Sequence, residues 1–465
     1  MWRFRTIGRV VSITGGHLGN ISPYAEYKRI RFDSRNVKEG DIFVALKGHN
    51  TDGHNYVDQA LSRGAIAAIV SEDYFFRYFH KKPLIGVSDT LKALWELASA
   101  RMQTEADNDT IAVVGSVGKT TTKELVSHLL SGMYSLYRTP GNFNTLISVP
   151  TEIVNMPLGI PMSVFELALH EVGDVDILAR IVTPKILIVT SIAAEHLEYL
   201  GDMATVKREN LQALKHVRTD GWVIIPSSLE KDVKKYTTIH SDQIITFGRK
   251  GHVDISAKSI HVDWSGTTFT LSAFGESKKI HIPLHGVHYV YDVMAAIATG
   301  LIYDLTLSYM ASRLSEFYPV WGRMQVYEYA GRKIVFDAYN ASPESMKYFL
   351  QTLQMLVEDK EHLILVIGDM KELGKYSRYY HEELADGIRH LKPGKVILVG
   401  SEVRFTYTNL EDTDIDVEIY ENVDEVRERI PHLIDYFEVV ALKGSRGVHL
   451  EKLLDVMGLM EDESP

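Results

Sequence analysis

A glycine-containing segment at 112–124, AVVGSVGKTTTKE, holds the residue types most able to do chemistry in this chain. An apolar run ends at Gly115, and a short loop leads through Gly118 to Lys119 and Thr120, where a helical pattern begins. Such a strand, loop and helix start offers free backbone N–H groups and the positive helix end to an anion, while lysine neutralises it and threonine can hold Mg²⁺. We interpret the segment as a loop that binds nucleotide phosphates. A plain strand-to-helix turn is the alternative, and Val113 stands where the usual pattern asks for glycine.

Two polar residues lie at unusual places next to apolar runs. Glu166 lies inside the run 162–168, where a carboxylate is costly unless it is paired or bound to a metal. In a phosphate-loop protein, an acid at such a strand end commonly contributes to the Mg²⁺ site, and a salt-bridged carboxylate is the alternative. His196 follows the apolar run 185–192, just past the strand's carboxyl end, where open α/β sheets place their ligands. We expect His196 to be functional, although a lone histidine is usually structural.

Two further segments have the composition of binding loops. Ser34 and Arg35, in DSR at 33–35, lie beside glycine turns and could bind a phosphorylated ligand; a surface turn with an ion pair explains them equally well. The segment 139–150, TPGNFNTLISVP, is rich in turn formers and amides, including Asn142 and Asn144. That composition suits a segment that crosses a ligand cleft.

The elements that position these residues form an α/β pattern. The first hundred residues alternate short apolar runs with glycine turns and helical patterns, and a polar stretch at 104–110 predicts a boundary. The run 262–274 alternates as a half-buried antiparallel strand does. A second change of organisation falls near 321–323.

Beyond that point four apolar strands are each followed by a loop and a helical pattern: 333–336, 363–367, 396–399 and 439–442. This repeat predicts a doubly wound parallel sheet whose strands' carboxyl ends line one edge. We expect five side chains to face a common crevice there, or to cap helices: Asp337, Asp369, Lys443, Ser445 and Arg446.

Composition limits the function classes. The formal net charge of −11 argues against a general nucleic-acid or membrane-surface binder. Cysteine is absent, which excludes disulfides, thiolate metal sites and cysteine nucleophiles. No run of about 18 apolar residues occurs, and the apolar stretch at the amino terminus is too short for a signal peptide. We expect a cytoplasmic monomer that neither inserts into membranes nor binds nucleic acid.

Taken together and in order, several stretches resemble the Mur ligase family. The matching pieces are DSRNVKEGDIFVALKG with DGH, GSVGKTTTKE, GNFNTLISVP, FEL, AEHLEYLG, HGVHYVYDVMAAIA, GRM, FDAYNASPES, VIGDMKELG and LKGSRG. The resemblance implies three α/β domains: a UDP-sugar (acyl acceptor) domain at 1–106, a phosphate-loop ATPase domain with a mostly parallel sheet at 107–321, and a Rossmann-like ligase domain at 322–465.

The implied reaction is ATP-dependent amide formation through an acyl phosphate, with ATP and Mg²⁺ as cofactors. The pieces are most similar to the family member that adds D-alanyl-D-alanine to UDP-MurNAc-tripeptide in peptidoglycan synthesis. Two alternatives stay open: a ligase for another carboxylate or amine, and a nucleotide-binding paralogue without ligase activity.

The resemblance also implies roles for single residues. The metal region would contain Thr120, Glu166 and His196. The nucleotide would contact Gly115, Ser116, Gly118, Lys119, Thr120, Thr121, His288, Asp292, Arg323 and Asp337. The UDP-linked carboxylate and the incoming amine would contact Ser34, Arg35, Asn142, Asn144, Tyr339, Asn340, Lys443 and Arg446.

The sequence departs from the family pattern at ligand positions. The family usually has a carbamylated lysine on the helix after the metal histidine, and ungapped alignment puts Asn210 there. Lys207 lies about one turn earlier and could take that catalytic role if the intervening loop is shorter. The motif on the adenine side, usually His-Asn with a second Asn, reads His288, Tyr289 and Asp292.

Overall fold

The computed structural model describes residues 5–48, 51–104 and 108–459. It contains three α/β sheets of five, nine and six strands, which confirms the predicted fold class. The chain divides into two compact units. The first unit comprises Met1–Ala112, Ser135–Leu167 and Asp176–Lys185, and the second comprises Val113–Tyr134, Ala168–Val175 and Ile186–Pro465. The three domain limits remain a prediction, and the one between 106 and 107 falls outside the described residues.

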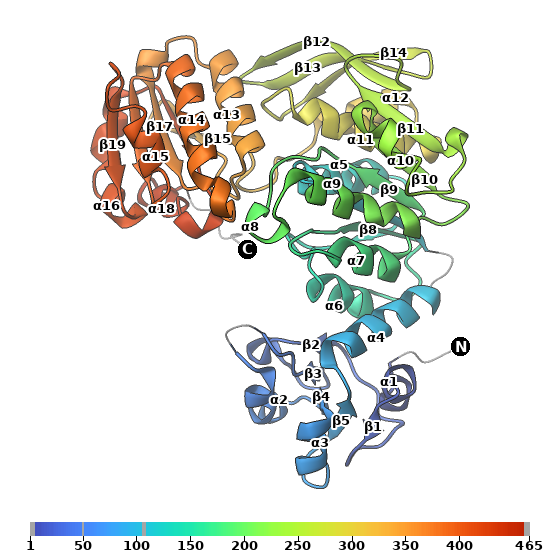
Figure 1. Ribbon diagram of the computed structural model, residues 1–465. Coiled ribbons are helices and arrows are strands. Elements are labelled where there is room, and N and C mark those ends of the chain that lie inside the picture. Colours follow the sequence, from blue (N-terminus) through green and yellow to red (C-terminus); the bar gives the residue numbers. More distant parts are fainter. Residues whose placement is uncertain (1–4, 49–50, 105–107, 460–465) are drawn as a thin grey trace. The chain divides into compact units, whose positions relative to one another are not determined.

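The first unit holds the five-stranded sheet, in the order β1-β5-β4-β3-β2. Its strands are β1 (His17–Leu18), β2 (Ile30–Arg31), β3 (Ile42–Val44), β4 (Ala67–Ser71) and β5 (Leu84–Val87). All neighbours are parallel except β1 and β5. The helices of this part are α1 (Ile7–Thr14), α2 (Val57–Ser62), α3 (Glu72–Tyr78) and α4 (Thr90–Thr104), coloured blue in Figure 1.

Polar contacts join α4 and strand β2 to helix α6 (Ser148–Asn155) in the same unit. The guanidinium of Arg101, on α4, is fully buried and donates to the carbonyl oxygens of Met156 and Pro157 at 3.3 and 3.0 Å. The Asn155 side chain pairs with the backbone N–H and C=O of Ile30 at 2.8 and 2.9 Å. Hydrogen bonds from buried side chains therefore tie the five-stranded sheet and α4 to the end of α6.

The nine-stranded sheet has the order β14-β13-β12-β11-β10-β9-β6-β8-β7. Its strands are β6 (Asp109–Val114), β7 (Leu136–Arg138), β8 (Met162–Glu166), β9 (Ile186–Val189), β10 (Trp222–Pro226), β11 (Ile244–Gly248), β12 (Ile255–Asp263), β13 (Gly266–Ala273) and β14 (Glu276–Ile282). Strands β12 to β14 are antiparallel, and β13 buries Phe269, Leu271 and Ala273. This confirms the predicted alternation.

Helices follow the strands of this sheet: α5 (Lys119–Leu130), α7 (Asp174–Val182), α8 (Leu197–Leu200), α9 (Met203–Leu211), α10 (Glu230–Val233), α11 (Tyr289–Ile302) and α12 (Leu307–Ser315). Helix α11 packs beside α5, as Figure 1 shows. The alanine side chains Ala295, Ala296 and Ala298 are fully buried on α11.

The six-stranded sheet has the order β15-β16-β20-β17-β18-β19. The four predicted strands are present as β16 (Arg332–Phe336), β17 (Leu363–Gly368), β18 (Lys395–Val399) and β20 (Val439–Lys443), all parallel. Two edge strands complete the sheet, β15 (Gln325–Tyr329) and β19 (Asp416–Tyr420). Its helices are α13 (Pro343–Leu356), α14 (Ser377–Leu391), α15 (Arg404–Thr408), α16 (Val423–Arg427), α17 (Ile430–Leu433) and α18 (Lys452–Val456). Figure 1 shows α13 and α14 side by side.

Candidate nucleotide and ligase site

The loop between β6 and α5 has a backbone that needs glycine at two positions. Gly115 and Gly118 have φ angles of +125° and +90°, which L side chains rarely adopt. A Cβ atom at Gly115 would lie 2.2 Å from Thr190 Oγ1, and one at Gly118 would lie 2.3 Å from Asp292 Oδ1. Helix α5 begins directly after Gly118. Its first-turn N–H groups have no acceptor inside the helix, so they can bind an anion.

Lys119 folds back onto this loop. Its Nζ donates to the carbonyl oxygens of Gly115 and Ser116 at 2.5 and 3.1 Å, and to Glu195 Oε2 at 3.2 Å. The ammonium group and the Glu195 carboxylate are both largely buried. A positive charge is thus held at the mouth of the loop, as neutralisation of phosphate charge requires.

Two buried carboxylates have an oxygen that lacks a hydrogen-bond partner among the described residues. Glu166 ends β8 in the first unit, is 2% exposed and accepts from Asn144 Nδ2 at 2.8 Å with Oε1, while Oε2 is unpaired. In the second unit, Glu195 Oε1 is also unpaired. Buried acceptor oxygens of this kind fit a hard divalent cation such as Mg²⁺. No preformed group of three or more metal ligands occurs within the described part of the chain.

His196 sits in a strained backbone conformation and is held by a distant acid. Its φ is +48°, an unusual value for a residue other than glycine. Its Nδ1 forms an ion pair with Glu372, and its ring lies 4.6 Å from the ring of His170. The contact with His196 lowers the pKa of Glu372, while burial and the neighbouring His196 lower the pKa of His170. His196 is therefore a precisely placed polar group rather than a free surface side chain.

The sequence reasoning did not single out Glu195 or Glu372 as site residues. Both lie in stretches that carried the family resemblance, AEHLEYLG and VIGDMKELG. The available signal for Glu195 was its place next to His196. Glu372 is 176 positions further along the chain, and only folding brings it to the histidine.

The two candidates for the carbamate position lie on helix α9 and have different surroundings. Lys207 is 38% exposed and forms an ion pair with Asp232. Asn210 is fully buried; its Oδ1 accepts from the Gly115 N–H at 2.9 Å, and its Nδ2 donates to the Val206 carbonyl oxygen at 3.0 Å. Asn210 thus contacts the phosphate loop itself, and a carbamate on Lys207 remains a prediction.

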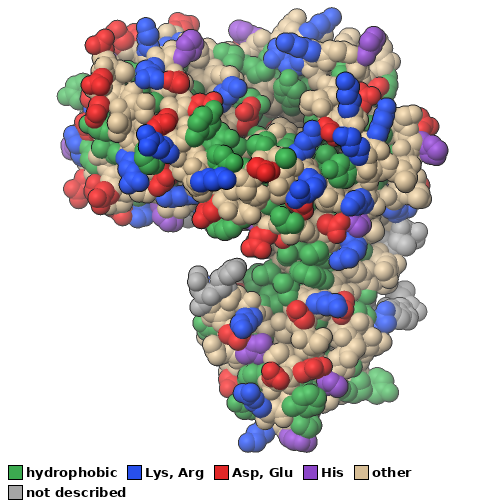
Figure 2. Space-filling view, in the orientation of Figure 1, with side chains coloured by type: hydrophobic (Ala, Val, Ile, Leu, Met, Phe, Trp, Pro, Cys, Tyr) green, Lys and Arg blue, Asp and Glu red, His purple; other side chains and the backbone are tan. Residues whose placement is uncertain are grey.

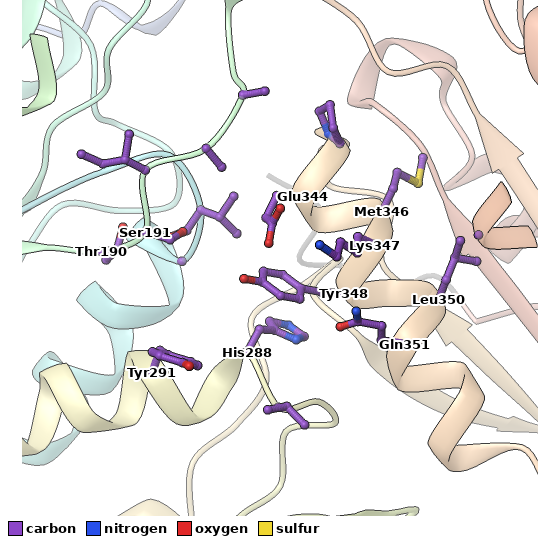
Figure 3. A pocket seen from close by; sticks show the side chains of 18 of the residues that line it. Thr190, Ser191, His288, Tyr291, Glu344, Met346, Lys347, Tyr348, Leu350 and Gln351 are labelled. Carbon is purple, nitrogen blue, oxygen red and sulfur yellow. The ribbon is translucent and has the colours of Figure 1, made fainter. Parts of the chain in front are cut away.

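A cavity of about 1300 Å³ opens beside the loop in the second unit. Residues of the loop, of the segment after β9, of α11, of α13 and of α14 line it. Figure 3 shows His288 and Tyr348 against one another in this cavity, with their ring planes only 9° apart and centroids separated by 5.1 Å. Glu344, Lys347 and Gln351 reach it from the same helix, α13 (Figure 3).

Burial sets the charge of the α11 residues at this cavity. It lowers the pKa of His288 to about 3 and raises the pKa of Asp292 well above its ordinary value. Near neutral pH the imidazole is therefore neutral.

The residues predicted for the third domain come together around Asp337. Lys443 is 1% exposed, and its Nζ donates to Asp337 Oδ2 at 2.6 Å and to the carbonyl oxygens of Asp337 and Asn340 at 3.3 and 3.2 Å. The guanidinium groups of Arg323 and Arg446 lie 4.5 and 5.6 Å from the ring centroid of Tyr339. Two positive planar groups over one aromatic ring form a surface suited to anionic groups.

Asp369 and Ser445 have structural partners. The Asp369 carboxylate is fully buried and accepts the backbone N–H groups of Ser401, Glu402 and Val403 at 2.9 to 3.1 Å. It therefore holds the turn between β18 and α15. Ser445 Oγ accepts the Lys371 N–H at 3.0 Å.

Of the predicted substrate residues in the first unit, some are buried or hydrogen-bonded inside the protein and others are exposed. Ser34 is buried, and its hydroxyl donates to Gln59 at 2.7 Å. Arg35 is 80% exposed and forms a paired contact with Asp33, which matches the surface-turn alternative. Asn142 is exposed, while Asn144 binds Glu166. Binding of a substrate by these residues remains a prediction.

The phosphate loop, its lysine and the adjoining cavity define the chain as a nucleotide-binding α/β protein of the phosphate-loop class. Acidic and basic side chains are interspersed on the face drawn in Figure 2, in keeping with a net charge of −11. Among the described residues, no helix has the length and apolar character needed to span a membrane.

Three family descriptions match successive parts of the chain: "Mur ligase family, catalytic domain" at 26–101, "Mur ligase middle domain" at 113–300 and "Mur ligase, glutamate ligase domain" at 322–446. The UDP-N-acetylmuramoyl-tripeptide--D-alanyl-D-alanine ligase of Rickettsia prowazekii is 30% identical over 98% of this chain and 99% of its own length. The chain belongs to the Mur ligase family, whose members are ATP-dependent amide ligases.

Solved structures agree with this assignment. A crystal structure of MurF from Acinetobacter baumannii has a TM-score of 0.89 at 28% identity, covering 98% of this chain and 99% of that one. MurF ligase from Thermotoga maritima, in complex with ADP, has a TM-score of 0.82 at 27% identity, covering 92% of this chain and 97% of that one. Similarity to MurF proteins thus extends over nearly the whole chain.

Proposed function

We propose that this ligase adds D-alanyl-D-alanine to UDP-MurNAc-tripeptide, using ATP and Mg²⁺, as a monomer in the cytoplasm. The observation that carries the proposal is the phosphate loop with Lys119 held at its mouth beside the cavity, in a chain similar to MurF proteins over nearly its full length. The domain limits 1–106, 107–321 and 322–465 belong to the same proposal.

In the first step, a substrate carboxylate oxygen attacks the γ-phosphorus of ATP and the bond to ADP breaks. In the second, the amine nitrogen attacks the acyl carbon and phosphate leaves. Such catalysis depends on alignment and charge neutralisation. Lys119 would leave Glu195 and neutralise the β and γ phosphates, while the first turn of α5 donates N–H groups to them.

Other residues of this chain would bind and orient the substrates. Arg323 and Arg446, held against Tyr339, would bind anionic groups of the nucleotide and of the incoming amine's carboxylate. His288 and Tyr348 would give the base a flat apolar wall.

Magnesium belongs to the same proposal. Thr120, Glu166 and His196 are its proposed ligands, and the unpaired buried oxygen of Glu166 supports that role. Mg²⁺ would neutralise phosphate charge when bound. His196 must first give up its ion pair with Glu372 if its Nδ1 is the atom that binds the metal.

A second candidate function keeps this chemistry and changes the carboxylate or the amine. The departures from the family pattern at Asn210 and Asp292 favour it. A nucleotide-binding protein without ligase activity is the third, and the retained Lys119 contacts count against it.

Phosphate release from ATP tests the proposal. We expect turnover that requires both UDP-MurNAc-tripeptide and D-alanyl-D-alanine, and none in Lys119→Ala, which lacks the neutralising charge. Turnover with the tripeptide but only with another amine would support the second candidate. ADP binding without turnover, across a panel of acceptors and amines, would support the third.

A further inference from the structure

Asn210 makes a contact that neither the family resemblance nor the proposed chemistry explains. The residue is fully buried near the end of α9, 95 positions from Gly115. Both ends of its amide are used, one by the Gly115 N–H and the other by the carbonyl oxygen of Val206, one turn earlier on the same helix. The side chain is therefore fixed in orientation by its own helix.

The first half of the phosphate loop is held entirely by protein groups. Gly115 donates to Asn210 at 2.9 Å, and the Ser116 N–H donates to the carbonyl oxygen of Ser191 at 2.7 Å. The carbonyl oxygens of the same two residues accept from Lys119. Their N–H groups are thus committed to protein acceptors, so the N–H groups that can bind phosphate lie after Ser116, in the rest of the loop and the first turn of α5.

Helix α9 holds a second loop of the site in the same way. Glu209, 5% exposed, accepts the Gly173 N–H with Oε2 at 3.0 Å, next in sequence to Asn210. That loop contains His170, whose ring lies against His196. Two consecutive buried side chains of α9 therefore brace two loops that carry site residues.

We infer that Asn210 is a positioning residue that clamps Gly115 and so fixes the phosphate loop in its nucleotide-binding conformation. The inference rests on the proposed nucleotide site. Gly115 tolerates little displacement, because a Cβ there would already contact Thr190, and its carbonyl oxygen anchors Lys119. Without the Asn210 side chain, the buried Gly115 N–H has no acceptor. Gly115, whose carbonyl oxygen accepts from Lys119, is then no longer held in place.

The test measures ADP binding with Mg²⁺ by calorimetry, with no acceptor or amine present. Asn210→Leu removes the acceptor at similar volume, and Asn210→Ala serves if the leucine variant does not fold. Leaving a buried donor unsatisfied changes an equilibrium constant by roughly 5- to 150-fold. We therefore expect the affinity for ADP to fall about tenfold. Asn108→Leu is the matched control, because Asn108 is also buried and fully bonded, to Ile160, Thr110 and Ser163, at the opposite end of β6.

Amide hydrogen exchange at Gly115 supplies a readout that a general loss of stability would not produce. We expect the Gly115 N–H to exchange faster in the Asn210 variants under native conditions, and to stay protected in Asn108→Leu. ADP affinity within twofold of the parent in a folded Asn210 variant, or unchanged protection of Gly115, overturns the inference. If the parent itself does not bind ADP, the proposed function fails, and exchange at Gly115 alone decides the clamp.

Discussion

Replacing Lys443 by methionine should destabilise the protein strongly. The substitution keeps the length of the side chain but removes a buried ammonium group that has three acceptors. The charged hydrogen bond to Asp337 contributes about 1.5–3 kcal/mol and the two carbonyl contacts about 1 kcal/mol each. The sum, about 3.5–5 kcal/mol, agrees with the 3–5 kcal/mol cost of breaking a buried ion pair. In the variant, the buried Asp337 carboxylate would keep one hydrogen bond, from the backbone N–H of Met324.

The assay is urea unfolding at pH 7, followed by circular dichroism and tryptophan fluorescence. Lys395→Met is the control, because Lys395 is nearly as buried but its partners Asp416 and Glu418 are 63% and 26% exposed. Those carboxylates can be rehydrated, so we expect the control to lose only about 1 kcal/mol. Adding Asp337→Asn to Lys443→Met should recover part of the loss by removing the unpaired charge. A Lys443→Met loss below about 1 kcal/mol, or equal to that of the control, would refute the reasoning.

Three further predictions concern the site. Lys207→Ala should lose ATP turnover that bicarbonate cannot restore, while the parent's turnover rises with bicarbonate; parental turnover in the variant would reject Lys207 as the carbamate carrier. Burial lowers the pKa of His288 from 6.5 in the unfolded state to about 3 in the folded state. Between these two pH values the unfolded state binds more protons, so the protein loses stability as the pH falls from 6.5 towards 3. Between pH 7 and pH 5 the parent's free energy of unfolding, measured with urea, should fall by about 2 kcal/mol more than that of His288→Gln. An equal fall in both proteins would contradict this. Glu166→Gln keeps an oxygen for Asn144 but removes the charge, so the Mg²⁺ concentration for half-maximal turnover should rise by roughly tenfold or more; an unchanged magnesium dependence would count against Glu166 as a ligand.

The fold could be predicted because its strands are buried apolar runs that end in glycine or polar residues. The run at 363–367 is an example: β17 is buried along its whole length, so hydrophobicity alone marks it. Strand β19 escaped prediction because it lies at a sheet edge, and its sequence, DVEIY, alternates charged and apolar residues with no fully buried position. Edge strand β15, QVYEY, escaped for the same reason.

The site could be predicted only where its chemistry is local in sequence. Lys119 and Thr120 follow Gly118 directly, so the loop is visible as a motif. The contacts of Asn210 with Gly115 and of Glu372 with His196 join distant segments, and no local pattern encodes them. The raised pKa of Asp292 likewise comes from burial under neighbouring elements and not from its own stretch of sequence.

The central claim, amide formation through an acyl phosphate, is tested most directly by following the substrate's carboxylate oxygen. UDP-MurNAc-tripeptide labelled with ¹⁸O in the reacting carboxylate would be turned over with ATP and D-alanyl-D-alanine, and the released phosphate analysed by mass spectrometry. The attacking oxygen stays on phosphorus when the amine displaces phosphate, so each phosphate should carry one ¹⁸O atom. Unlabelled phosphate, released together with the amide product, would contradict the acyl phosphate route.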